Sequence, residues 1–424
     1  MSPRAVAIDL TRLSTRLGQP SPSGIDRVEL AYARHFLRED GPRFGLVSTG
    51  MGPRVLDRAT ALDLAETVAA GWVEDASAQA DPVYCRLAGL PAPAARTSVR
   101  PGGDGRRMRA ETGLRILRGG RVDDLPASTA YLHVSHLRLE RSRRFDWLYA
   151  RSDIRAVFTV HDLIPIRYPE YCRACEAERH AARLETVARH AAHVLVDTAA
   201  IGADLRDHLA SRGQPAPPTT TAHLGIEASF IEAGRSGAGA TDPAFERPTF
   251  IVCGTVEPRK NHLVLLNAWR ALAARGGPVP RLLVVGRRGW EAESAVAMLD
   301  RCPSLRGHVE EVTDLSTPGL ATLMRRATAL LMPSFSEGYG LPILEAAACG
   351  LPVVASDIPV HRETAGAIAH FVDPNDGLGW MRAVEMLSEA ASPLRTDLFR
   401  RLAAFAPPTW AAHFERVEGV IAGL

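Results

Sequence analysis

The chain has 424 residues, more than one ordinary hydrophobic core supports, so two or three domains are expected. Hydrophobic residues make up 46% and charged residues 23% of the chain, and the formal net charge is only +2, so the composition gives no indication of a nucleic-acid partner. No apolar run approaches 18 residues, and residues 1–4 lead directly into a strand-like segment, which predicts neither a signal peptide nor a membrane span. We therefore expect a cytoplasmic protein.

In the first half of the chain, apolar strand-like runs alternate with helical periodicity, a pattern typical of a parallel sheet covered by helices. A Gly-, Pro- and Ser-rich loop precedes Gly24 and separates the first strand from the first helix. The expected strands are residues 5–10, 44–48, 130–134, 156–160 and 193–197, and the expected helices are 25–37, 62–72 and 171–191. Residues 221–226 are expected to close the first domain.

Residues 86–121 interrupt this alternation. Prolines and glycines break any periodicity, and the segment contains nine arginines but only two acidic residues, Asp104 and Glu111. The sequence predicts a basic, poorly ordered insertion here. The insertion either rests on an anionic lipid surface or is a solvated loop, and the sequence leaves both alternatives open.

Residues 233–248 are rich in glycine and proline and are typical of a linker, after which the strand and helix alternation resumes. The expected strands are 249–254, 281–286, 329–332, 353–355 and 370–372. The expected helices are 261–275, with Asn261 as its N-cap, 315–327 and 409–421.

Six cysteines are few for this length, and only Cys172 and Cys175 are close together. A single C-x-x-C pair is weak evidence for zinc binding or redox chemistry, so we expect two thiols on one face of a helix.

Lysine is rarer still. Lys260 is the only lysine among 50 basic residues, which favours a site that needs a compact point charge rather than a planar guanidinium.

The most informative stretch is 333–350, which follows a short apolar run and predicts a strand, a glycine loop and a helix. Gly338 and Gly340 permit a tight turn, and Pro342 suits the first turn of a helix. Such a helix N-terminus attracts an anion such as a diphosphate, while Glu337 and Glu345 can accept hydrogen bonds from sugar hydroxyls. A dinucleotide fingerprint is disfavoured because Ile343 stands in place of the third glycine. A plain turn with a solvated Glu337 is the alternative.

The residues Ser334, Glu337-Gly-Tyr-Gly-Leu-Pro342, Glu345-Ala346 and Gly350-Leu-Pro-Val-Val-Ala355 resemble the Glu-x7-Glu signature of retaining family 4 glycosyltransferases. Residues 161–165, His-Asp-Leu-Ile-Pro, resemble a stretch of mannosyl- and related transferases, and residues 255–261 resemble the basic turn at the donor diphosphate. Residues 24–28 resemble the first loop and helix of these enzymes, although Asp26 and Arg27 fit a solvated first turn equally well. The resemblance covers most of the chain from residue 130 onward.

The resemblance implies an α/β protein of the GT-B fold, with two Rossmann-like domains and a nucleotide-sugar site in the cleft between them. It implies domains at 1–232, with the basic insertion, and 249–406, joined by the linker 233–248, and a C-terminal helix in 407–424 that crosses back to the first domain. The implied catalytic residues are His161, Lys260 and Glu337, and the implied donor-binding residues are Gly24, Arg259, Gly338, Tyr339, Gly340, Leu341 and Glu345.

In these roles, Glu337 binds sugar hydroxyls, Glu345 binds the ribose, and Arg259 with Lys260 stabilises the departing diphosphate. No Asp-x-Asp sequence occurs, so we expect no metal, and no cofactor is implied. The expected function is retaining transfer of a sugar, with GDP-mannose as the first choice of donor, to a glycan or polyprenyl-linked acceptor in polysaccharide biosynthesis, at the inner face of the membrane if the protein is peripheral.

Two alternatives remain. A GT-B phosphorylase or nucleotide-sugar epimerase would share the fold, and a non-catalytic nucleotide-binding subunit would share the nucleotide site. The latter would be expected to have lost Glu337 or Lys260, and both are present.

Overall fold

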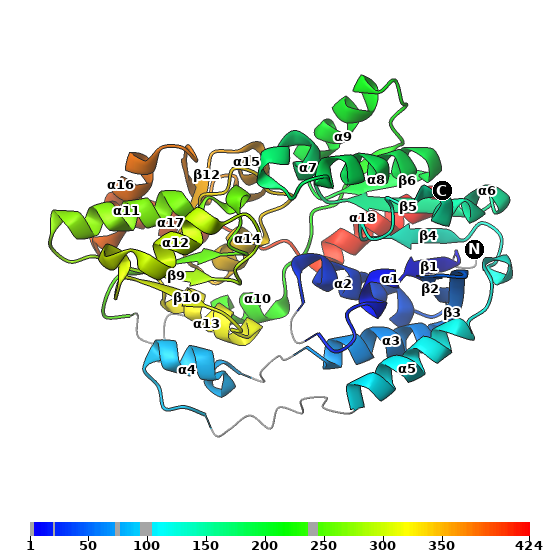
Figure 1. Cartoon of the computed structure of the whole chain (residues 1–424), viewed down its shortest axis with the longest axis horizontal. Helices are drawn as coiled ribbons and strands as arrows, with labels where there is room; N and C mark the ends of the chain where they lie inside the picture. Colours follow the sequence, from blue (N-terminus) through cyan, green and yellow to red (C-terminus); the bar gives the residue numbers. More distant parts are fainter. Residues whose placement is uncertain (1–3, 20–21, 73–76, 94–103, 236–244) are drawn as a thin grey trace.

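The computed structural model describes residues 4–19, 22–72, 77–93, 104–235 and 245–424. Two sheets, each covered by helices on both faces, form two domains that lie side by side (Figure 1). This arrangement confirms the predicted α/β fold.

Within the described residues the first sheet has seven strands in the order β3-β2-β1-β4-β5-β6-β7. All its pairings are parallel except that of β3 with β2. The strands are β1 (Val6–Asp9), β2 (Arg43–Thr49), β3 (Gly52–Asp57), β4 (Ala130–His133), β5 (Arg155–Val160), β6 (His193–Val196) and β7 (Thr219–Thr221). The antiparallel strand β3 and the short edge strand β7 have no counterpart among the predicted strands.

The second sheet is parallel throughout, with six described strands in the order β10-β9-β8-β11-β12-β13. The strands are β8 (Thr249–Cys253), β9 (Arg281–Val285), β10 (Val309–Val312), β11 (Ala329–Met332), β12 (Val353–Ser356) and β13 (Ala369–Val372). The central strands are apolar runs buried on both faces, because helices cover both sides of the sheet. Strand β10 was not predicted, because two glutamates interrupt its apolar residues.

The helices that cover the first sheet are α1 (Thr11–Ser14), α2 (Gly24–Arg38), α3 (Arg58–Ala70), α5 (Asp104–Leu117), α6 (Trp147–Ala150), α7 (Ile164–Arg167), α8 (Glu176–His190) and α9 (Ala199–Ser211). The remaining helices are α4 (Pro82–Ala88), α10 (Ala228–Arg235), α11 (His262–Arg275), α12 (Glu293–Arg301), α13 (Thr317–Arg326), α14 (Leu341–Ala348), α15 (Pro359–Ala365), α16 (Gly377–Ser388), α17 (Pro393–Leu402) and α18 (Trp410–Gly423).

The C-terminal helix α18 leaves the second domain and packs on the first, beside α2 (Figure 1). Phe414 and Val417 are buried against Tyr32 and Phe36 of α2. His413 Nε2 lies 2.8 Å from the hydroxyl of Tyr32, which satisfies both buried groups. This packing joins the end of the chain to its first helix.

The prediction of a poorly ordered segment over 86–121 is wrong for residues 104–117, which form α5. Tertiary contacts decide this: Ile116 is buried against the first domain, and Arg109 Nη2 donates to the carbonyl of Leu17 at 2.8 Å. Residues 94–103 of the predicted insertion lie outside the described residues, as do 236–244 of the predicted linker.

Two local predictions are also corrected. Helix α8 begins at Glu176 rather than 171, because Cys175 has a φ of 64°, so Cys172 and Cys175 precede the helix instead of sharing its face. Asn261 does not cap α11 with its side chain, since its own φ is 52°. Its Nδ2 donates instead to the carbonyls of Pro333, at 3.1 Å, and Pro374, at 2.8 Å.

Candidate active site

The carboxyl ends of the parallel strands of both sheets, where α/β proteins place ligands, carry the predicted site residues. Two helix N-termini approach each other there, that of α2 from the first domain and that of α14 from the second. A Cβ at Gly24 would lie 4.0 Å from Cδ1 of Leu341. Their free backbone N–H groups and positive dipole ends suit an anion such as a diphosphate.

Local sequence fixes the start of each helix. At α2, Ser23 and Asp26 form a capping box, and the carboxylate of Asp26 also pairs with Arg12 at 2.6 Å. At α14, Gly340 precedes the first helical residue with a φ of 87°, a conformation that favours glycine. The predicted strand, glycine loop and helix are therefore present.

A buried ionic cluster lies between the ends of β8 and β11. One oxygen of Glu337, Oε1, lies 2.5 Å from Nζ of Lys260 and accepts a hydrogen bond from Ser334 at 2.6 Å. The other oxygen accepts from Arg259 at 2.8 Å, and Arg259 also pairs with Glu257. The residues predicted to act on the sugar and on the diphosphate thus form one cluster.

The charges in this cluster set the protonation of its members. Burial alone would raise the pKa of Glu337, but the charges of Lys260 and Arg259 outweigh burial and hold that pKa well below its usual value. Burial lowers the pKa of Lys260, opposed by Glu337. Glu337 therefore stays ionised in the cluster, as a carboxylate that orients two cations.

Gly338 lies where the backbones of the two domains approach closely. A Cβ at Gly338 would lie 2.5 Å from the carbonyl oxygen of His161, which follows β5 of the first domain. Gly338 has no positive φ, so its role is close backbone approach rather than the tight turn predicted for it. Tyr339 also contacts the first domain, because its hydroxyl donates to the carbonyl of Leu224 at 2.9 Å.

The imidazole of His161 is engaged at both nitrogens. Nδ1 lies 2.7 Å from Oδ2 of Asp197, and Nε2 lies 2.7 Å from the carbonyl oxygen of Val134. Burial alone would lower the pKa of His161, but Asp197 outweighs burial and raises it. With both nitrogens hydrogen-bonded inside the first domain, the side chain positions the loop after β5, and the backbone carbonyl is the part that faces Gly338.

Asp197 was not among the predicted residues, although its position at the end of a strand is visible in the sequence. It directly follows β6, the neighbour of β5, so the carboxyl ends of the two strands place Asp197 beside His161. That neighbour relationship cannot be read from one sequence without knowing the strand order.

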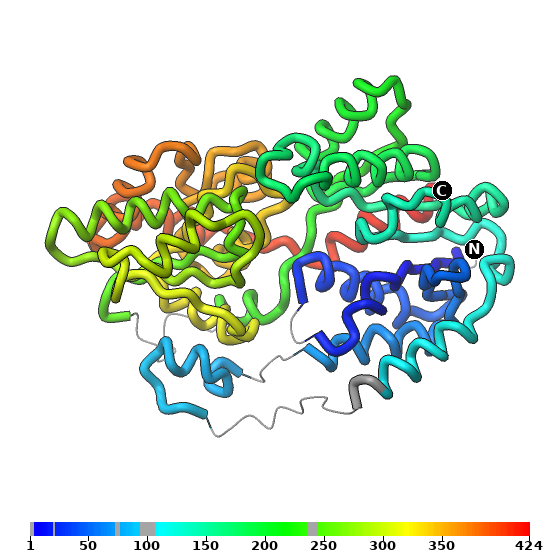
Figure 2. The backbone as a smooth tube through the Cα atoms, viewed as in Figure 1, coloured from blue at the N-terminus to red at the C-terminus, as the bar shows by residue number. Residues whose placement is uncertain are grey.

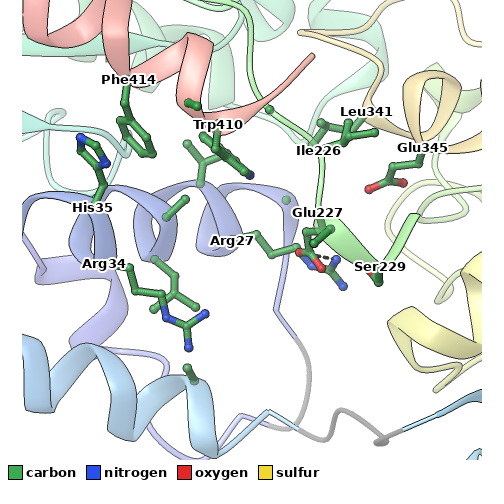
Figure 3. Close-up of a pocket in the computed structure, with 18 of the residues that line it drawn as sticks. Arg27, Arg34, His35, Ile226, Glu227, Ser229, Leu341, Glu345, Trp410 and Phe414 are labelled. Atoms are coloured by element: carbon green, nitrogen blue, oxygen red, sulfur yellow. Dashed lines mark hydrogen bonds and ion pairs between the residues drawn. The ribbon is translucent and has the colours of Figure 1, made fainter. Parts of the chain in front are cut away.

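Glu345 faces a different space from Glu337. It lines a cavity of about 880 Å³ between the domains, together with Gly24, Arg27 and Leu341 (Figure 3). Burial raises the pKa of Glu345 to about 7. On the opposite wall Arg27 Nη1 pairs with Glu227 at 2.7 Å.

A second interdomain cavity, of about 400 Å³, lies beyond the ends of β8, β9 and β10. Its walls are Gly254, Thr255, Gly286, Arg287 and residues 312–317 of the second domain, and Arg16, Gln19, Pro22, Ser23, Asp26 and Arg27 of the first. Arg27 reaches across it, since Nη2 donates to Oγ1 of Thr317 at 2.9 Å. Arg27 therefore separates this cavity from the one that Glu345 lines.

Only one group of potential metal ligands gathers among the residues that the structure describes. His35, Glu39 and Glu418 bring one ligand atom each to within 4.8 Å of one another. They lie at the surface on α2, at its end and on α18, and none of them belongs to the predicted site. Over the same residues, no helix is both long and apolar enough to cross a bilayer.

The family model of the glycosyl transferases group 1 matches residues 247–390. The serotype-specific mannosyltransferase WbdA of Escherichia coli is 33% identical over 222 residues, which cover 50% of this chain and 27% of WbdA. The O-antigen chain mannosyltransferase B of Escherichia coli is 30% identical over 233 residues, covering 52% of this chain and 58% of the relative. The chain thus spans a quarter to three fifths of these relatives.

Solved structures show the same fold over nearly the whole chain. Anabaena HepE in complex with UDP gives a TM-score of 0.58 at 13% identity, and the superposition covers 100% of each chain. Sucrose-phosphate synthase from Thermosynechococcus elongatus gives a TM-score of 0.60 at 17% identity, over 99% of each chain. Residues 247–390 therefore match the glycosyl transferases group 1 model, half of the chain is similar to mannosyltransferases, and the chain as a whole has the GT-B fold.

Proposed function

We propose that this protein is a retaining glycosyltransferase that moves a sugar from a nucleoside-diphosphate donor, GDP-mannose as the first choice, to a glycan or polyprenyl-linked acceptor in polysaccharide biosynthesis. The similarity of half of the chain to a serotype-specific and to an O-antigen chain mannosyltransferase supports the sugar and the pathway class. The reaction would use neither a metal nor a cofactor.

The observation that carries the proposal is the meeting of Lys260 and Arg259 with Glu337 beside the facing N-termini of α2 and α14. The N-termini of two helices and two cations bring positive charge of the kind that suits a diphosphate. Preorganised positive charge of this kind acts on the charge that grows on a leaving group, which is where sugar transfer needs stabilisation.

In the proposed step, the bond between the anomeric carbon and the diphosphate oxygen breaks, and its electron pair stays on that oxygen. Lys260, Arg259 and the backbone N–H groups at the start of α14 stabilise the resulting charge. The acceptor oxygen bonds to the anomeric carbon on the same face, and its proton passes to the departing phosphate. Glu337 orients the two cations and receives sugar hydroxyls.

The two interdomain cavities fit the rest of the donor. The base would occupy the 400 Å³ cavity at the ends of β8, β9 and β10, and the ribose would lie past Arg27, beside Glu345 in the 880 Å³ cavity. Glu345 would accept hydrogen bonds from ribose hydroxyls, and such donors favour the ionised form of a carboxylate whose pKa burial has raised to about 7.

Peripheral membrane contact remains part of the proposal. Leu114 and Leu117 of α5 are 49% and 45% exposed, and the exposed Arg118 directly follows the helix. Exposed leucines with arginines suit an anionic lipid surface. A polyprenyl-linked acceptor would be found at such a surface.

A panel of nucleotide sugars incubated with the protein and a polyprenyl-linked acceptor, with products analysed by mass spectrometry, tests this function. GDP-mannose should give a mannosylated product in which NMR shows the anomeric configuration of the donor. Transfer from UDP-sugars alone would remove the donor assignment. An inverted anomeric centre would remove the mechanism. Release of sugar phosphate, or epimerised donor, would favour the phosphorylase or epimerase alternatives.

A further inference from the structure

Residues 77–90, which we call the arm, pack on the second domain although they lie between segments of the first domain in the sequence. Helices α3 and α5, which come before and after the arm in the chain, both pack with the first sheet, whereas α4 of the arm lies against α13 (Figure 2). Tyr84, Cys85 and Leu87 are buried in one cluster with the apolar residues of β8 and β11. The arm is thus a detour of the chain across the domain boundary.

One fully buried carboxylate holds the arm in place. Asp81 Oδ2 accepts hydrogen bonds from the backbone N and from Oγ of Ser316, both at 2.7 Å. Its Oδ1 accepts from the backbone N of Val83 at 2.8 Å, which caps α4. Ser316 is itself the N-cap of α13, since its Oγ accepts from Gly319 N at 3.1 Å. A single carboxylate therefore serves the N-termini of two helices, where negative charge is favoured.

The rest of the arm is anchored to the same domain. Arg326, near the end of α13, donates to the hydroxyl of Tyr84 at 3.3 Å. Arg86 pairs with Glu310 of β10. Contacts at both ends of α13 and on the neighbouring strand fix the arm relative to this helix.

The start of α13 is also a wall of the 400 Å³ cavity. Ser316 and Thr317 line that cavity, and Thr317 accepts the hydrogen bond from Arg27 of the first domain. Space on the other side of this turn is tight, since a Cβ at Gly319 would lie 2.5 Å from Oδ2 of Asp81. The cavity wall and the carboxylate of Asp81 are therefore in direct contact.

We propose that Asp81 is a positioning residue for the nucleoside cavity: by joining the arm to the N-terminus of α13, it sets the place of Ser316 and Thr317 and hence the fit of the donor nucleoside. The proposal rests on the proposed function, which assigns the base of the donor nucleoside to this cavity. Asp81 touches neither the diphosphate nor the sugar in this scheme, so it acts on donor binding and leaves the chemical step unchanged.

Isothermal titration of GDP and UDP into the wild type, Asp81→Asn and Asp57→Asn tests it. Asp57 caps α3 on the first domain, accepting from Thr60 N at 3.0 Å at an exposed site, so it controls for the loss of a helix cap alone. The nucleotide that the wild type binds should bind Asp81→Asn about tenfold more weakly, since charge-assisted hydrogen bonds to the cavity wall are lost. Asp57→Asn should bind it as the wild type does.

Steady-state kinetics separates positioning from stability. Asp81→Asn should raise the KM for the donor and keep kcat at saturating donor. A lower melting temperature with unchanged KM would show a merely structural role and overturn the inference. A wild type that binds neither nucleotide overturns the proposed function and this inference together, whereas equal binding by wild type and Asp81→Asn overturns this inference alone.

Hydrogen exchange on the wild type gives a readout that needs no variant to fold. Coupling between two sites is reciprocal, so the bound nucleoside diphosphate should slow exchange of the amides of Val83 and Tyr84 in the arm as well as that of Gly319 in α13. Slower exchange in α13 with no change in the arm would contradict the coupling.

Discussion

The ammonium group of Lys260 lies 2.5 Å from Oε1 of Glu337, so the only lysine of the chain is ion-paired with the first carboxylate of the Glu-x7-Glu stretch. The space around Lys260 is limited. Gly254 has a φ of 134°, and a Cβ there would lie 3.1 Å from Cε of Lys260. The side chain of Lys260 thus packs closely against Gly254, which favours a compact ammonium over a broad guanidinium in a chain that otherwise uses arginine.

Replacing Lys260 should therefore affect the reaction rate more than donor binding. We expect Lys260→Ala to lower kcat about 10²-fold or more, since it removes a preorganised charge that acts on the leaving diphosphate. Lys260→Arg should also stay well below the wild type. Steady-state kinetics at saturating donor checks both variants, and near-normal kcat in Lys260→Arg would show that the identity of the cation is unimportant.

The raised pKa of Glu345 predicts a pH-dependent nucleotide affinity. Hydrogen bonds from ribose hydroxyls favour the carboxylate, so binding releases a proton, and the Kd of the nucleotide should fall as pH rises through about 7. Titration calorimetry of the wild type and Glu345→Gln between pH 6 and 8 measures this. The variant should show a flat profile, and an equally flat wild type would exclude Glu345 as the ribose ligand.

Glu345 also predicts the pH dependence of stability. Its pKa is about 7 in the folded chain and near 4.5 when unfolded, so the unfolded state binds fewer protons between these values. The free energy of unfolding should therefore fall by up to about 3 kcal/mol as pH rises through this window. Denaturant unfolding at pH 5 and pH 8 should show this fall in the wild type and a smaller one in Glu345→Gln.

Gly338 should tolerate no side chain. Gly338→Ala would push a Cβ against the carbonyl of His161, so the two domains separate slightly and the donor is misplaced. A loss of activity of about 10²-fold is expected. Gly419→Ala in α18, where a Cβ meets open space, is the matched control and should keep full activity. Equal activities of the two variants would show that the close approach is dispensable.

The buried pair of His161 and Asp197 should contribute to stability below neutral pH. Because the pKa of His161 is raised, this contribution is fully present below its unfolded value of about 6.5 and is lost as pH rises through the folded value. Asp197→Asn should cost about 3 kcal/mol or more at pH 6 and less at pH 9. Asp63→Asn, which breaks an exposed pair with Arg115, should cost under about 1 kcal/mol at either pH. Denaturant unfolding of both variants measures the difference.

Membrane contact through α5 is tested by flotation with anionic vesicles. Leu114→Glu with Leu117→Glu should abolish co-flotation and leave nucleotide binding intact, because the exposed leucines would no longer enter the lipid interface. Leu378→Glu, at a 58% exposed leucine of the second domain, is the control. Unchanged flotation of the double variant would remove α5 from the proposal.

The sequence by itself determined the local units. Apolar runs such as β11 and the periodicity of α2 gave their elements within a residue or so, because burial on both faces or on one face imposes a clear pattern. The strand, glycine loop and helix around Gly340 followed from chemistry that few other residues permit. Composition also singled out Lys260 before any contact was known.

The tertiary structure alone decided which of these units meet. Strand order placed Asp197 beside His161 and turned both nitrogens of that imidazole inward, which no local pattern indicates. Helix α5 exists because Arg109 and Ile116 find partners on the first domain, against a composition that suggested disorder. The arm is held on the second domain because Asp81 accepts hydrogen bonds at the N-terminus of α13. Its partner there, Ser316, is 235 positions away along the chain. Such contacts depend on distance in space, and a single sequence records only distance along the chain.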